Sequence, residues 1–235
     1  MTGAAYTKLS SGAAPDPPDG TVPRLIGVIH LGALPGSPRQ AAALGEVAES
    51  AARDARALEA AGFDAVVVEN FGDAPFFPGA VPPITVAAMT RCALAVRAAA
   101  PSLALGINVL RNDAEAALAV AVATGAGFVR INVHIGARVT DQGLVEGAAH
   151  RTLRSRRELG ADAVQLFCDV DVKHSAPLGA GRPIGEEAHD LAERAHADAV
   201  LVTGSGTGRA AARADLEAVV AAVRVPVLVA SGATV

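Results

Sequence analysis

A lysine stands beside two aspartates in the segment FCDVDVKHSAPLG, residues 167–179. The chain has eighteen arginines and two lysines, so lysine is an unusual choice of cation here. Unlike a guanidinium, an amine loses its proton when it is desolvated, and it can then serve acid–base or carbonyl chemistry. We therefore take Lys173 as a candidate catalytic residue, with Asp169 and Asp171 beside it. A structural ion pair is the alternative.

The residues before this lysine are typical of a buried strand. If the strand continues far enough, its alternation places Asp169, Asp171 and Lys173 on one face, and Val170 and Val172 on the other. We expect the polar face to meet a ligand and the valine face to meet helices. Two carboxylates near the amine favour its charged form, and thus an electrostatic or general-acid role over a Schiff base.

Other polar side chains stand at the ends of apolar runs. Glu69 follows three valines, and burial there would raise the pKa of its carboxyl and suit it to general acid or base chemistry. His30 could transfer protons, and Asn108 and Asn132 could orient hydroxyl groups, although such residues also serve as structural anchors. We count Glu69, Asn108 and His30 as candidate catalytic residues. We expect Arg111 to face solvent.

Glycines follow two successive apolar runs near the end of the chain. In the first segment, VTGSGTG, they allow backbone N–H groups to approach an anion, and a helix is expected to begin soon afterwards. The second follows the next run, where α/β barrels often bind phosphate. A flexible connection is the alternative. The sequence thus predicts a substrate phosphate site formed by Gly204, Gly206, Gly208, Ser231 and Gly232.

The sequence predicts no bound metal and no organic cofactor. It has no local ligand spacing such as H-E-x-x-H, and no G-x-G-x-x-G follows the first apolar run. A metal site remains the weaker alternative, because five candidate ligands could converge: His30, Glu69, Asp169, Asp171 and His174.

The elements that must position these residues alternate along the chain. Strand-like runs occupy 25–30, 64–70, 103–110, 128–133, 163–170, 198–203 and 225–231. Helix-like segments occupy 46–61, 84–99, 113–124, 147–159, 186–196 and 209–223. This alternation predicts an α/β protein with a parallel sheet. Because every strand ends in a polar residue, we favour a TIM (β/α)8-type barrel over an open, doubly wound sheet.

The length of 235 residues suits one domain, and we assign the barrel to residues 24–235. Residues 1–23 are rich in proline, glycine and serine, and we expect a disordered N-terminal extension. The chain ends after its seventh strand, so we interpret it as a barrel truncated there, with its C-terminal quarter missing. Seven parallel strands would leave two unpaired edges, and we expect an unstable protein.

Composition excludes several classes of protein. The net charge is −4, with acidic and basic residues interspersed, so nucleic acid is not an expected partner. The longest charge-free run, 74–90, holds four prolines, and we expect no transmembrane segment. Cys92 and Cys168 form no disulfide framework, which indicates a cytoplasmic protein. The sequence leaves a homo-oligomer open.

Six segments, in order along the chain, resemble the BtpA family, also called BtpA/SgcQ. They are IGVIHLGALPGSPR (26–39), VVVENFGDAPF (66–76), GINVLRNDAEAALAVA (106–121), FVRINVHIGARVTDQGLVEG (128–147), DVDVKH (169–174) and VTGSGTG (202–208). The resemblance implies a TIM barrel related to ribulose-phosphate-binding barrels. It also implies a longer relative, since family members continue past the Ser-Gly-x-Thr motif.

The residue patterns and the family resemblance suggest two functions of different kinds. The first is an isomerase- or lyase-like enzyme that acts on a small phosphorylated metabolite, derived from a sugar or nucleotide, by acid–base or carbonyl chemistry. The second, which the family name suggests, is a non-catalytic biogenesis or stability factor for a membrane complex such as photosystem I. Converging ionisable groups favour the enzyme, whereas an exposed apolar patch outside the barrel mouth would favour the second.

Overall fold

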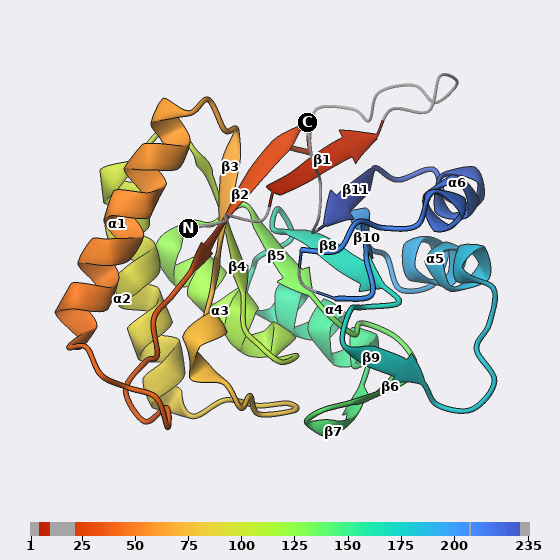
Figure 1. Ribbon diagram of the computed structural model, residues 1–235, viewed down its shortest axis with the longest axis horizontal. Coiled ribbons are helices and arrows are strands. Elements are labelled where there is room, and N and C mark those ends of the chain that lie inside the picture. The colour runs from red at the N-terminus through yellow and green to blue at the C-terminus, as the bar shows by residue number, and fades with distance from the viewer. Residues whose placement is uncertain (1–4, 10–21, 207, 231–235) are drawn as a thin grey trace.

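The computed structural model describes residues 5–9, 22–206 and 208–230. In these residues a closed barrel runs in the order β1-β11-β10-β8-β5-β4-β3-β2 (Figure 1). Seven of these strands form a continuous parallel sheet, as in a TIM-type barrel. They are β2 (Leu25–His30), β3 (Ala65–Glu69), β4 (Ala104–Asn108), β5 (Phe128–Ile131), β8 (Gln165–Val170), β10 (Ala199–Thr203) and β11 (Val227–Ala230).

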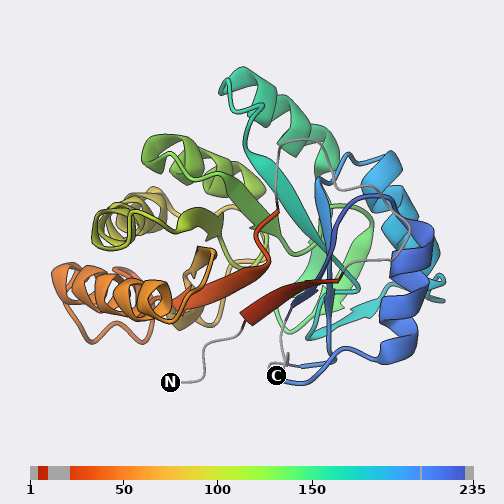
Figure 2. The ribbon, with the colours of Figure 1, turned by 90° about the horizontal axis from the view of Figure 1, so that it is seen from above.

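Helices surround the barrel on its outside (Figure 2). They are α1 (Leu44–Ala60), α2 (Pro83–Ala99), α3 (Ala114–Thr124), α4 (Ala149–Glu158), α5 (Ile184–Glu193) and α6 (Arg213–Ala222). Each predicted strand and helix is found, with ends shifted by a few residues, which confirms the barrel. None of the helices in the described ranges combines the length and the apolar character that crossing a membrane would require.

The first strand, β1 (Ala5–Leu9), takes the remaining place in the barrel. It runs antiparallel to both neighbours, with Ala5 opposite Gly27 of β2 and Leu9 opposite Val227 of β11. The expectations of disorder at residues 5–9 and of two unpaired edges are therefore wrong. Edge strands carry unpaired N–H and C=O groups, which a short segment can satisfy in either direction. Val22, also in the predicted extension, is described and buried at 3% exposed, whereas residues 1–4 and 10–21 lie outside the described residues.

The barrel interior has an apolar layer below the strand ends. The rings of Phe128 and Phe167 stack there with centroids 4.6 Å apart. Gly106 makes room for them, because a Cβ at this position would lie 2.1 Å from Cε2 of Phe128. Val67 and Leu201 belong to the same buried cluster. Since strand side chains alternate, the residue two positions further on in each strand enters the next layer towards the mouth.

A small sheet, in the order β7-β6-β9, lies beside the mouth and was not among the predicted elements. Its strands are β6 (Ala137–Thr140), β7 (Gly143–Glu146) and β9 (Ser175–Pro177). The β6–β7 turn carries Asp141 and Gln142, and both side chains line the cavity at the barrel mouth. The insertions after β5 and β8 therefore help to build the wall of that cavity.

Candidate active site at the barrel mouth

Three charged side chains meet directly above the apolar layer. Arg130 of β5 donates from Nη1 to Oε1 of Glu69 at 2.9 Å. Its Nη2 and Nε donate to Oδ2 and Oδ1 of Asp169 at 2.9 and 3.1 Å, which is a bidentate pair. Each of the three residues is 4% exposed. The guanidinium thus fixes two buried carboxylates from β3 and β8 on either side of itself.

Glu69 is held as an anion. Burial works to raise the pKa of its carboxyl, but Arg130, His30 and Asn108 outweigh burial and bring the pKa well below its ordinary value of 4.5. Asn108 donates from Nδ2 to Oε1 at 2.9 Å, and His30 Nε2 lies 3.6 Å from Oε2. The expectation of a raised pKa is wrong because it did not include Arg130. Glu69, Asn108 and Asp169 thus lie together at one mouth of the barrel.

A cavity of about 750 Å³ lies above this network, and Lys173 lines it. The backbone of Lys173 is held on both sides, since its N–H donates to Thr203 Oγ1 at 3.0 Å and its carbonyl accepts from Arg111 Nη2 at 2.7 Å. Burial lowers the pKa of the Lys173 amine, Arg130 lowers it further, and the nearby carboxylates only partly compensate. Asp169 raises the pKa of this amine, as expected, but burial and Arg130 outweigh it, so the net shift is downward.

Asp171 does not join the site. Strand β8 ends at Val170, and Asp171 then adopts a left-handed backbone with φ of 47°. Its carboxylate turns towards the small sheet, where Arg138 Nη1 donates to it at 2.7 Å. The predicted alternation thus holds through Val170 and fails at the next residue, although Lys173 still reaches the cavity.

The glycine segment after β10 lies beside the same mouth. A Cβ on Gly206 would stand 3.6 Å from Cε1 of His174, the neighbour of Lys173. Gly204 is required by close packing, because a Cβ there would lie 2.2 Å from the carbonyl oxygen of Arg209. Gly208 has φ of 77°, in the left-handed region that favours glycine. Ser231 and Gly232, the other predicted phosphate residues, lie outside the described residues.

Sequence reasoning missed two arginines of the site. Arg130 could have been found, because a charged residue in an apolar strand, two positions from Phe128 and from Asn132, must face the barrel interior. Arg111 was expected to face solvent, yet it is 5% exposed and lines the cavity. It lies in a loop, where no periodicity indicates the direction of a side chain.

The alternative metal site is not supported. Within the described residues, no group of three or more histidine, cysteine, aspartate or glutamate side chains is placed to hold an ion. The proposed ligands are separated, since Arg130 lies between Glu69 and Asp169, and Asp171 points to Arg138.

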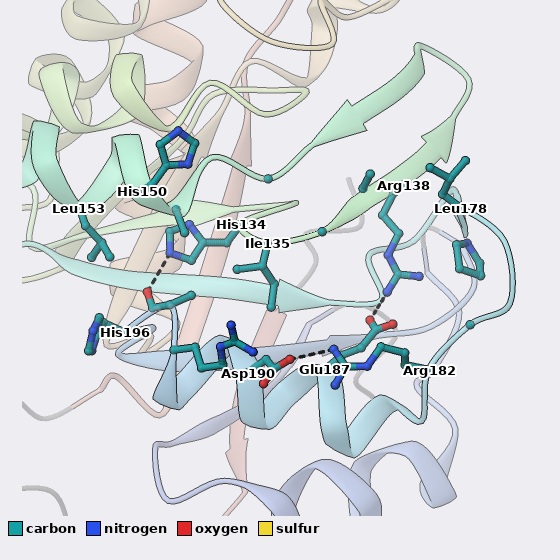
Figure 3. A pocket seen from close by; sticks show the side chains of 18 of the residues that line it. His134, Ile135, Arg138, His150, Leu153, Leu178, Arg182, Glu187, Asp190 and His196 are labelled. Carbon is teal, nitrogen blue, oxygen red and sulfur yellow. Dashed lines mark hydrogen bonds and ion pairs between the residues drawn. The ribbon is translucent and has the colours of Figure 1, made fainter.

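A second cavity, of about 700 Å³, lies outside the barrel between α4, α5 and the small sheet (Figure 3). His134 lines it and is hydrogen-bonded through Nε2 to the carbonyl of Ala195 at 3.0 Å. Its charged residues are largely engaged with each other, as in the pair of Arg182 and Asp190 at 2.8 Å. None of the predicted catalytic residues lines this cavity, so the barrel mouth is the stronger candidate site.

Comparison with known proteins finds relatives that match most of the chain. The model of the BtpA family matches residues 21–235. A Synechocystis protein called "Photosystem I biogenesis protein BtpA" is 47% identical over 212 residues, which are 89% of this chain and 72% of that protein. An uncharacterized protein of Pyrococcus furiosus is 44% identical over 208 residues, 88% of this chain and 77% of its own length.

Among solved structures, a mandelate racemase/muconate lactonizing enzyme from Roseiflexus sp. has a similar fold. Its TM-score is 0.50 at 16% identity, and the alignment covers 85% of this chain and 44% of that one. This chain therefore spans less than half of that solved protein. At such low identity the likeness concerns the fold alone.

Proposed function

The chain belongs to the BtpA family, and we propose that it is an enzyme that moves a proton on a small phosphorylated metabolite, derived from a sugar or nucleotide. The observation that carries this proposal is the amine of Lys173. It faces a cavity of about 750 Å³, and its pKa is lowered by burial and by Arg130. A lowered pKa makes the neutral form of the amine easier to reach, which suits general base chemistry.

The reaction proposed is of the isomerase or lyase class. The neutral amine of Lys173 takes a proton from a carbon next to a carbonyl group, the C–H electron pair moves to the carbonyl oxygen, and the resulting ammonium returns the proton. Arg130 lines the same cavity and would stabilise the negative oxygen. Glu69 and Asp169 hold Arg130 in place, and His30 and Asn108 contact Glu69.

The phosphate group would lie at the glycine segment. Gly206 adjoins His174, so a phosphate there would be close to the part of the cavity that Lys173 and His174 line. Backbone N–H groups in glycine-rich turns are suited to anions. We place the enzyme in the cytoplasm, in keeping with Cys92 and Cys168, which are buried and unbridged.

A binding role is the second candidate, and exposed apolar residues favour it. Val139 and Leu144 are opposite each other in the β6–β7 hairpin and are 44% and 47% exposed. Such a patch is suited to a protein partner. A relative's name refers to photosystem I biogenesis, so a scaffold for assembling a membrane complex is the specific form of this alternative.

Native mass spectrometry of the purified protein separates the two functions. We expect a bound small molecule that leaves on activation and whose fragments include phosphate ions. The variant Lys173→Met should carry less of it, and Arg213→Met, which changes an exposed residue paired with Glu217, should carry the same amount. A stoichiometric protein partner without a phosphorylated ligand would contradict the enzyme.

A further inference from the structure

Three residues that line the mouth cavity have a buried polar atom without a hydrogen-bond partner among the described residues: Arg111 (Nε), Asn132 (Oδ1) and Gln142 (Oε1). Arg111 and Asn132 are the two of them that are buried as whole residues. Both residues line the cavity, and they are 5% and 2% exposed. Buried donors and acceptors in folded proteins are almost always satisfied, because an unmade hydrogen bond costs free energy. The buried donor of Arg111 and the buried acceptor of Asn132 therefore indicate a ligand that supplies an acceptor to the first and a donor to the second.

Arg111 differs from the other buried arginine of the site. Arg130 is neutralised by Glu69 and Asp169, whereas no carboxylate of the described residues forms an ion pair with Arg111. Its Nη2 donates to the carbonyl of Lys173 at 2.7 Å, and this contact fixes the plane of the guanidinium. Asp169, Asp141 and Glu69 attract this guanidinium, but none of them forms an ion pair with it, so an anionic group from a ligand is the natural direct partner.

Asn132 is fixed in a similar way. Its Nδ2 donates to Oδ2 of Asp169 at 2.7 Å, which orients the amide and leaves Oδ1 as an acceptor. An acceptor in a buried position selects a donor such as a hydroxyl group, because an apolar or anionic group would leave it unsatisfied. Arg111 and Asn132 are therefore suited to bind different groups of one ligand.

We propose that the ligand is a hydroxylated carboxylic acid, with its carboxylate on Arg111 and a hydroxyl group on Asn132. The planar edge formed by Nε and Nη2 matches the two oxygens of a carboxylate, which is the geometry that arginine binds best. This inference rests on the proposed function for the phosphate and narrows the substrate to a phosphorylated sugar acid. The carboxylate and the phosphate would occupy different parts of the mouth.

Calorimetric titration with matched pairs of ligands tests this inference. Each pair consists of a phosphorylated sugar acid of three to six carbons and the phosphorylated polyol that has CH₂OH in place of the carboxylate, for example 6-phosphogluconate and sorbitol 6-phosphate. In at least one pair the acid should bind about 10- to 100-fold more tightly than the polyol. Arg111→Gln should remove this preference, and Arg213→Gln should keep it. Asn132→Leu should weaken both members of the pair.

The outcomes separate this inference from the proposed function. Equal binding of acid and polyol in every pair, or no binding of any acid at millimolar concentration, overturns the carboxylate site. Equal binding of gluconate and 6-phosphogluconate would support the carboxylate site and contradict the phosphate of the proposed function. If Arg111→Gln does not fold, as shown by its melting curve, the comparison of acid and polyol on the unsubstituted protein decides.

Discussion

Replacing Arg130 by methionine is expected to lower the free energy of unfolding by about 3–5 kcal/mol, because it leaves two buried carboxylates without a counter-charge. Glu69 and Asp169 each accept hydrogen bonds from this guanidinium, and all three residues are buried. Urea denaturation measures the change through the transition midpoint and its slope. The control Arg213→Met removes an exposed pair with Glu217 and should change stability by less than about 1 kcal/mol.

The loss of stability in Arg130→Met should depend on pH. Pairing lowers the pKa of Glu69 below 4.5, so the stability that it contributes is present above pH 4.5 and is lost as the pH falls below that value. In Arg130→Met the main remaining effect on Glu69 is burial, which raises the pKa, and stability is then lost as the pH rises through the raised value. The difference in stability between the two proteins should shrink as the pH falls from neutral. A constant difference would contradict the account.

Replacing Lys173 by arginine is expected to lower turnover by about 10²- to 10⁴-fold, the usual loss when a general acid or base is removed. Arginine keeps the charge and the approximate reach, but it does not release a proton in the physiological range. Because the neutral amine is the base, the rate of the unsubstituted enzyme should fall as the pH drops below the lowered pKa of Lys173. A Lys173→Arg variant with near-normal turnover would show that the residue is a structural cation. Arg213→Lys serves as the control.

Local patterns in the sequence predicted those parts of the molecule that depend on local geometry. Apolar runs and polar strand ends identified the barrel and brought Glu69 and Asp169 to one mouth, because the carboxyl ends of parallel strands share one edge. The side-chain alternation of β8 was correct as far as Val170. It failed at Asp171, where a left-handed backbone turns the side chain away.

Contacts between distant segments determined what the sequence did not show. The pKa of Glu69 depends on Arg130, which lies sixty-one positions along the chain and on another strand. The orientation of Arg111 depends on the carbonyl of Lys173. Closure by β1 depends on backbone pairing with both ends of the sheet, which a local pattern cannot indicate. These three features can be predicted only when the fold is already known.

Lys173 is proposed to move a proton on a phosphorylated metabolite. The most direct test is ¹H NMR in D₂O, with the protein incubated with a panel of phosphorylated ketoses, aldoses and sugar acids. We expect the signal of a carbon-bound proton next to a carbonyl group to disappear in at least one compound with the unsubstituted protein, and to persist with Lys173→Met. No exchange in any compound, or exchange at the same rate with Lys173→Met, would contradict the claim.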